Sequence, residues 1–151
     1  MSSIRSSIEP VVKEVDVPAP PEVAFARFTA EIDSWWPKAT HSVGQERCRS
    51  VSWEGPVGAD LFEMTEDGAR HVWGTFKTWD PPRGFSMSWH PGRDPSTAQH
   101  VEVTFEPRGE STRVTLTHGG FDSLGENGQE TRDRYDGGWM GVLAILQSSW
   151  G

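Results

Sequence analysis

Five histidines and one tyrosine are the side chains of this sequence best suited to proton transfer. The histidines are His41, His71, His90, His100 and His118. Each falls on a different predicted element, and no two of them form an HxH or HxxxH spacing. A metal centre needs clustered His, Cys or carboxylate ligands, so we expect neither a metal ion nor another cofactor.

Motifs for nucleophilic catalysis and for phosphate binding do not occur in the sequence. There is no GxSxG segment, and the lone Cys48 is typical of a small buried hydrophobic residue. The glycines of 125–128 are not followed by Lys-Ser or Lys-Thr, as a phosphate-binding loop requires. We interpret the glycine-rich stretch 119–128 as a connecting loop.

Two polar residues could still act inside a cavity. His118 shares the parity of the apolar residues in its alternating segment, which predicts that its side chain lies on the buried face. His118 is either a strand-end histidine bonded to backbone or water, or a functional residue. In the second case it forms a hydrogen bond to a ligand or acts as a general acid/base. As a catalyst it would pair with Tyr135, Glu63 or Asp122. Tyr135 is the only tyrosine, and its hydroxyl needs a partner if it is buried.

Alternating apolar and polar segments position these residues on an antiparallel sheet with one wet face. Strands are expected over 8–17, 47–54, 59–65, 69–79, 85–90, 101–106 and 113–118. Two short helices are expected within 22–36, with a break near Thr29 or Ala30, after prolines that end the first strand and favour a helix start. Trp35 and Trp36 are adjacent, so they cannot both face one core from a helix. We expect one of them at a cavity mouth, in the following loop or on a partner surface.

A long apolar helix closes the chain. The apolar residues on one face of this helix recur at helical spacing. They are Tyr135, Trp139, Val142, Leu143, Leu146 and Trp150. Thr131 or Asp133 is the expected N-cap. The glycines at 137, 138 and 141 cost helix stability, which indicates close packing on the sheet or room for a ligand.

A curled sheet with a helix laid across it encloses a cavity, and such pockets are lined mostly by apolar and aromatic side chains. The candidate ligand-binding residues are Trp53, Trp73, Trp89, Phe105, His118, Tyr135, Trp139 and Val142. No catalytic residue is assigned.

The amino-acid composition limits the kinds of partner that this protein can be expected to bind. The 151 residues predict one domain over 8–151, after a flexible segment 1–7. The net charge of −8 argues against nucleic acid and against an anionic membrane surface. No signal peptide or membrane-spanning run is apparent, and the single cysteine cannot form an intrachain disulfide, so we expect a cytoplasmic protein. Only 34% of the residues are hydrophobic, yet eight are tryptophan, so large rings must provide much of the burial.

Several short motifs are similar to a known family. They are WDPP at 79–82, FSMSW at 85–89, VTFEPRGESTRVTLTHGGF at 103–121, and Gly138-Trp139 with Leu143 and Leu146. Together with the element order, they resemble the START-like (SRPBCC) superfamily, in the subgroup homologous to the activator of the heat shock protein 90 ATPase. The resemblance covers the chain from about Val11 onward. It implies an α+β helix-grip fold, with a six- to seven-stranded curled sheet gripping the C-terminal helix and two short helices after the first strand.

The resemblance also implies a deep cavity between sheet and helix. Members of the wider superfamily bind lipids, sterols, polyketides or plant hormones there, and a few catalyse cyclisation or dehydration. We favour noncatalytic binding of a small hydrophobic molecule. The alternatives are a cavity enzyme of the cyclase, dehydratase or hydrolase kind, and a co-chaperone-like protein-binding module. The eukaryotic activator carries a further amino-terminal domain that 151 residues cannot hold, so we do not expect ATPase stimulation. A homodimer through a sheet edge is another option.

Overall fold

The fold is a seven-stranded antiparallel sheet that holds a long C-terminal helix across one face. The computed structural model describes residues 8–53 and 58–150, so the expected flexible segment 1–7 and the end of the strand expected over 47–54 lie outside the described residues. The strands are β1 (Val11–Val17), β2 (Cys48–Trp53), β3 (Asp60–Thr65), β4 (Arg70–Asp80), β5 (Gly84–Trp89), β6 (Gln99–Arg108) and β7 (Ser111–Gly119).

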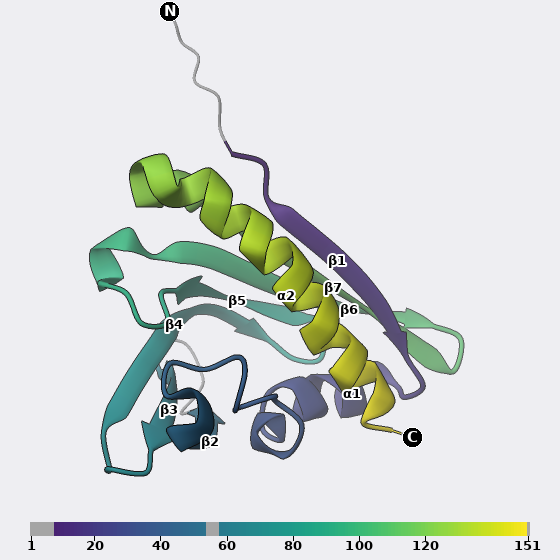
Figure 1. The fold of residues 1–151 in the computed structure, drawn as a ribbon. Helices are drawn as coiled ribbons and strands as arrows, with labels where there is room; N and C mark the ends of the chain where they lie inside the picture. Colours follow the sequence, from purple (N-terminus) through teal and green to yellow (C-terminus); the bar gives the residue numbers. More distant parts are fainter. Residues whose placement is uncertain (1–7, 54–57, 151) are drawn as a thin grey trace, which may run out of the picture.

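The strand order across the sheet is β1-β7-β6-β5-β4-β3-β2. The consecutive strands β2 to β7 therefore form a meander, and the first strand closes the far edge by pairing with the last. The C-terminal helix α2 (Gly128–Ser148) runs diagonally over this curved sheet, beside β1 (Figure 1). This arrangement confirms the predicted α+β helix-grip architecture.

Two short helical segments follow β1, as predicted. The α-helix α1 (Pro21–Phe28) begins with a proline at its first position, and the 3-10 helix η1 spans Ile32–Ser34. Thr29 lies at the break, where both its N–H and its hydroxyl donate to the carbonyl of Phe25. The side chain therefore competes for the backbone acceptor at the helix end.

Trp35 and Trp36 are both buried, so the prediction that only one of them faces the core is wrong, whereas the expected place of one of the pair at a cavity agrees with Trp36, which lines the pocket described below. Their exposed fractions are 7% and 6%. The helical segment before them already ends at Ser34, so the pair does not lie on one regular helix and both rings can turn inward. Trp35 donates its indole N–H to the carbonyl of Arg27 at 2.6 Å, and Trp36 donates to the carbonyl of His41 at 2.8 Å.

The C-terminal helix begins earlier than predicted. A 3-10 helix, η4 (Phe121–Asn127), replaces the expected connecting loop and leads directly into α2 at Gly128. The predicted caps Thr131 and Asp133 therefore lie inside the helix, and Asn127 at the N-cap position makes no side-chain capping bond. Gly128 permits this early start because any Cβ there would collide with the carbonyl oxygen of Phe121.

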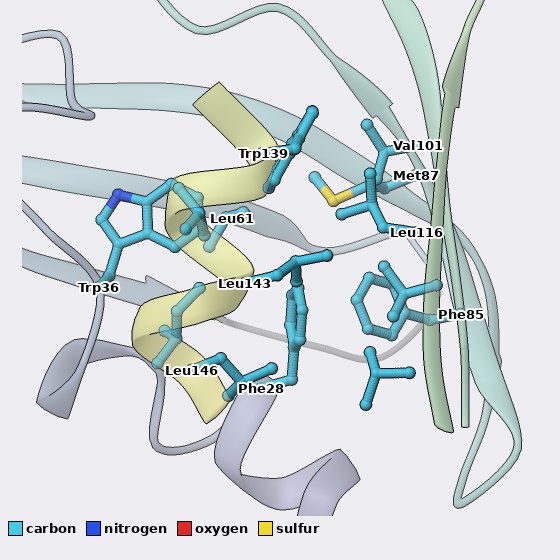
Figure 2. Packing of buried hydrophobic residues seen from close by; sticks show 14 of the residues in the cluster. Phe28, Trp36, Leu61, Phe85, Met87, Val101, Leu116, Trp139, Leu143 and Leu146 are labelled. Atoms are coloured by element: carbon cyan, nitrogen blue, oxygen red, sulfur yellow. The ribbon is translucent and has the colours of Figure 1, made fainter. Parts of the chain in front are cut away.

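Aromatic rings pack much of the space between sheet and helix. Figure 2 shows Phe28 and Phe85 packed between the sheet and the α2 residues Trp139, Leu143 and Leu146. The ring centroids of Phe28 and Phe85 are 5.7 Å apart in an edge-on arrangement, which aromatic pairs favour. The prediction that large rings provide much of the burial is thus confirmed.

Gly74 on β4 lies in close contact with the neighbouring strand β5. A Cβ at this position would overlap the carbonyl oxygen of Ser88 and come within 2.8 Å of the Met87 Cε atom. We expect Gly74→Ala to lower the free energy of unfolding by about 1–3 kcal/mol, the usual range for overpacking. Urea denaturation measures this loss. Gly137→Ala is the control, because no atom lies within 4 Å of a Cβ there; equal stability of the two variants would contradict the expectation.

Candidate functional site

A pocket of about 510 Å³ opens between α2, the sheet and the loops after η1 and β5. Helix α2 forms one wall with Tyr135, Gly138, Trp139 and Val142. The opposite side consists of sheet and loop residues, namely Trp36, Thr40, His41, Ser42, Val43, Trp73, Trp89, Pro91 and Gly92. Among the described lining residues, Arg134 carries a formal charge, and His41 and Tyr135 have titratable side chains.

Four indole rings form a closed circuit at this pocket. The centroid distances are 5.2 Å from Trp36 to Trp73, 5.8 Å from Trp73 to Trp89, 5.3 Å from Trp89 to Trp139, and 6.0 Å from Trp139 back to Trp36. All four side chains are buried. Because they come from the η1 loop, β4, β5 and α2, the pocket exists only when these elements are assembled.

Every one of these four indole N–H groups donates to another protein group. Trp36 donates to a backbone carbonyl, Trp73 to Glu63 Oε1 at 2.7 Å, Trp89 to Tyr135 Oη at 3.1 Å, and Trp139 to His118 Nδ1 at 2.9 Å. The polar edges of the rings are thus already satisfied. What they present to the pocket is apolar ring surface.

Glu63 ties the loop over the pocket to the sheet behind it. Its side chain is fully buried, and its oxygens accept bonds from the backbone N–H groups of Val43 and Gly44 at 2.7 and 2.8 Å and from the Trp73 indole. All three partners are N–H donors, so both oxygens act as acceptors. Glu63, which the sequence offered as a catalytic partner of His118, therefore holds two walls of the pocket together through its hydrogen bonds.

Tyr135 presents a hydrogen-bond donor to the pocket. Its hydroxyl accepts from the Trp89 indole, and within the described part of the chain no acceptor receives its own proton. Burial raises the pKa of the Tyr135 hydroxyl, so the proton is retained at neutral pH. The hydroxyl can therefore donate to an acceptor atom of a bound molecule.

His118 lies on the predicted buried face but behind the pocket wall. Its ring is stacked against Phe121 at a centroid distance of 4.4 Å and is 4.5 Å from the ring of Tyr135. Trp139 can only donate, so Nδ1 is the acceptor, and Nε2 carries the proton that bonds Gln99 Oε1 at 3.3 Å. Burial lowers the pKa of His118 to about 3, which keeps the ring neutral.

This network leaves no ring nitrogen of His118 for proton transfer. The sequence offered Tyr135, Glu63 and Asp122 as catalytic partners, but no hydrogen bond joins any of them to His118 among residues 8–53 and 58–150. Asp122 instead accepts from the backbone N–H of Ile8 at 3.3 Å. The alternative interpretation, a strand-end histidine bonded to backbone or water, is right about a structural role, but the partners are the side chains of Trp139 and Gln99.

His41 is a pocket residue that sequence reasoning missed. Its Nδ1 lies 2.7 Å from the Thr40 hydroxyl, and burial lowers its pKa. Its Nε2 lies 4.0 Å from where a Cβ of Gly138 would stand, so the ring reaches across to α2. His41 belongs to a loop without periodicity, and the sequence holds no signal that would bring this loop to the helix.

The eight residues predicted to bind a ligand divide into two groups. Five line the pocket: Trp73, Trp89, Tyr135, Trp139 and Val142. Trp53 instead stacks on Phe76 at a centroid distance of 4.3 Å, and Phe105 packs 5.2 Å from Phe25 in the core. His118 supports the wall through Trp139. Whether the five residues bind a ligand stays a prediction.

Three observations bear on other classes of site. Over the described ranges, no three His, Cys, Asp or Glu side chains gather closely enough to hold a metal ion. Cys48 is buried, and burial raises the pKa of its thiol, which disfavours the reactive thiolate. None of the helices found in residues 8–53 and 58–150 has both the length and the apolar character needed to span a membrane.

The sequence profile of the Activator of Hsp90 ATPase homolog 1-like protein matches residues 18–150 of the chain. No protein with a curated description matches it. One similar solved structure is an anthrahydroquino-gamma-pyrone synthase, Txn09, complexed with SUM. It is 31% identical, has a TM-score of 0.60, and the match covers 88% of this chain and 90% of the synthase.

Two further solved structures share the fold. CalC, a self-sacrificing resistance protein from Micromonospora echinospora, is 27% identical with a TM-score of 0.68, and 94% of each chain is covered. The Aha1 dimer from Colwellia psychrerythraea is 15% identical with a TM-score of 0.68, and 93% of this chain and 94% of that chain are covered.

Proposed function

The chain belongs to the Activator of Hsp90 ATPase homolog 1-like family, as its motifs indicated, and we propose that its pocket binds a planar, largely apolar aromatic molecule. One observation carries this proposal. Four indoles line the pocket with every N–H engaged elsewhere. A molecule that enters meets ring faces, against which flat aromatic systems stack favourably.

The size and polarity of the pocket support a small molecule. Ligand pockets commonly measure about 300–1,000 Å³ and combine apolar walls with a few placed polar groups; this one measures about 510 Å³. Tyr135 and His41 are two polar groups that line it without a full set of protein partners. They would fix the orientation of a ligand that carries an oxygen substituent.

The relatives above 25% identity support a ligand-binding domain. The synthase was solved as a complex with SUM and is named for a fused-ring product, and CalC is named as a resistance protein. We extend only the binding of a fused-ring molecule to this chain. Aha1 shares the fold at 15% identity, which carries neither chaperone binding nor a homodimer to this protein; both stay predictions.

A leucine at Gly138 tests the pocket. Gly138 lines it, so Gly138→Leu should fill the space facing His41 and weaken binding of quinizarin, a hydroxylated anthraquinone, by about tenfold or more, a loss of at least about 1.4 kcal/mol. Quenching of tryptophan fluorescence measures the affinity. Gly137→Leu is the matched control, because this neighbour is exposed and gains the same helix propensity.

The outcomes separate cleanly. Binding that survives in Gly137→Leu and is lost in Gly138→Leu supports the proposal. Failure of the unmodified protein to bind quinizarin, or a preference for a fatty acid or sterol over it, would overturn the assignment of a planar aromatic ligand.

A further inference from the structure

We propose that His41 and Tyr135 form an acid–base pair that catalyses enolisation, the removal of a proton activated by a carbonyl group, in an aromatic ketone held in the pocket. The inference rests on the proposed function, because it needs the ring system to be bound between the indoles. It adds a reaction and a substrate class, a fused-ring ketone. Neither residue is used by the network around His118.

His41 supplies the base. In the arrangement that uses both donors, its Nδ1–H donates to the Thr40 hydroxyl at 2.7 Å, and that hydroxyl donates to the Pro37 carbonyl at 3.4 Å. This leaves the lone pair of Nε2 without a protein partner in the described part of the chain. Orientation of the ring through its far nitrogen is the way in which histidine bases are commonly held.

Tyr135 supplies the acid. Its oxygen already accepts the indole N–H of Trp89, so its single proton is directed elsewhere, and the residue lines the pocket. A hydroxyl held in this way is a preorganised donor for an oxygen on which negative charge develops.

The two groups reach the pocket from opposite walls. His41 lies over Gly138, and Tyr135 stands three residues earlier on α2, on the same face of the helix and about one turn away. A fused-ring ketone between them can direct its carbonyl oxygen at Tyr135 and an activated C–H bond at His41. Trp89 and Trp139 also line the pocket.

The proposed step is a reversible proton transfer without an oxidant. The C–H bond breaks, its proton passes to His41 Nε2, and its electron pair becomes the new carbon–carbon double bond. The carbonyl π electrons move onto oxygen, which the Tyr135 hydroxyl stabilises by a hydrogen bond. In D₂O the proton held on His41 exchanges with the solvent, and return of a deuteron from His41 then restores the ketone with deuterium on that carbon.

Deuterium exchange into 2-tetralone and anthrone, followed by proton NMR, tests the inference. These probes place the acidic C–H at different distances from the carbonyl oxygen. The unmodified protein should accelerate exchange of at least one of them by about 10²-fold or more over buffer, the usual contribution of a positioned general base. His41→Gln should lose most of this acceleration, whereas the affinity for the probe, measured by tryptophan quenching, should fall much less than the exchange rate.

Two further variants separate catalysis from structure. Tyr135→Phe should bring the exchange rate down toward the buffer rate, because the loss of one oxyanion donor costs about 10²–10³-fold, and His41→Ala should regain exchange when imidazole is added to the solution. His100→Gln is the control histidine variant, because His100 is exposed on β6, and it should exchange like the unmodified protein.

The failures are distinguishable. Binding of a probe without exchange above the buffer rate, or full exchange in His41→Gln, would overturn the acid–base pair and leave the proposed binding function standing. Absence of binding by 2-tetralone, anthrone and quinizarin alike would overturn both.

Discussion

Replacing Glu63 by alanine is expected to lower the free energy of unfolding by about 3 kcal/mol or more, because each buried donor left without an acceptor costs about 1–3 kcal/mol. The reason is that the substitution leaves three donors without their acceptor: the N–H groups of Val43 and Gly44 and the indole of Trp73. Urea denaturation measures the loss. The same variant should lose affinity for quinizarin, since the loop carrying His41 is no longer held against the sheet.

Glu63→Gln and Glu66→Ala are the matched controls. Glutamine keeps one acceptor oxygen, but its amide NH₂ group would face the backbone N–H of Gly44, and two donors cannot form a hydrogen bond. We therefore expect a loss of stability between those of the two alanine variants. Glu66 is exposed, and its removal changes the same charge without touching the loop. Equal stability of Glu63→Ala and Glu66→Ala would show that the buried carboxyl group does not hold the two walls together.

Acidification is expected to destabilise the protein through His118. The pKa of this residue is about 3 in the fold against 6.5 for the unperturbed side chain, so between these values the unfolded chain binds a proton that the folded chain does not. Stability is full above pH 6.5 and falls as the pH decreases, by up to about 1.4 kcal/mol per pH unit. Over the whole interval the loss approaches about 5 kcal/mol.

Denaturation in urea at a series of pH values between 6.5 and 4.5 measures this slope. In this window the lowered pKa values of Asp16, Asp67, Asp80 and Asp94 contribute little, because their effect is lost only as the pH falls further. The matched variant is His118→Gln, whose amide oxygen can still accept from Trp139 but does not titrate. A slope that is unchanged in this variant would contradict the assignment; His41 has a lowered pKa as well and accounts for a smaller residual slope.

Periodicity in the sequence was sufficient for most of the sheet. The alternation in 85–89, 101–105 and 114–118 predicts three strands that the structure contains as β5, β6 and β7. The same parity predicts that His118 is buried, as it is. The start of α2 was predicted wrongly because the contact of Gly128 with Phe121 comes from tertiary packing, and the local sequence offers better caps further on.

The site was less predictable than the fold, since its polar residues depend on contacts between distant segments. The hydrogen bond from Trp139 joins His118 across 21 positions, and parity alone does not name such a partner. Glu63 was considered as a catalytic group, yet its carboxylate oxygens accept hydrogen bonds from the backbone of a loop about 20 residues earlier in the chain. His41 lies in that loop, where neither a period nor a motif marks it.

The circuit of four indoles has an optical consequence. Rings whose centroids lie 5.2–6.0 Å apart are close enough for their transition dipoles to couple, so excitation energy absorbed by one of Trp36, Trp73, Trp89 and Trp139 can pass to the others. The near-ultraviolet circular dichroism of the protein should therefore contain an exciton couplet. A bound molecule that accepts energy from one of these rings would therefore quench the fluorescence of all four.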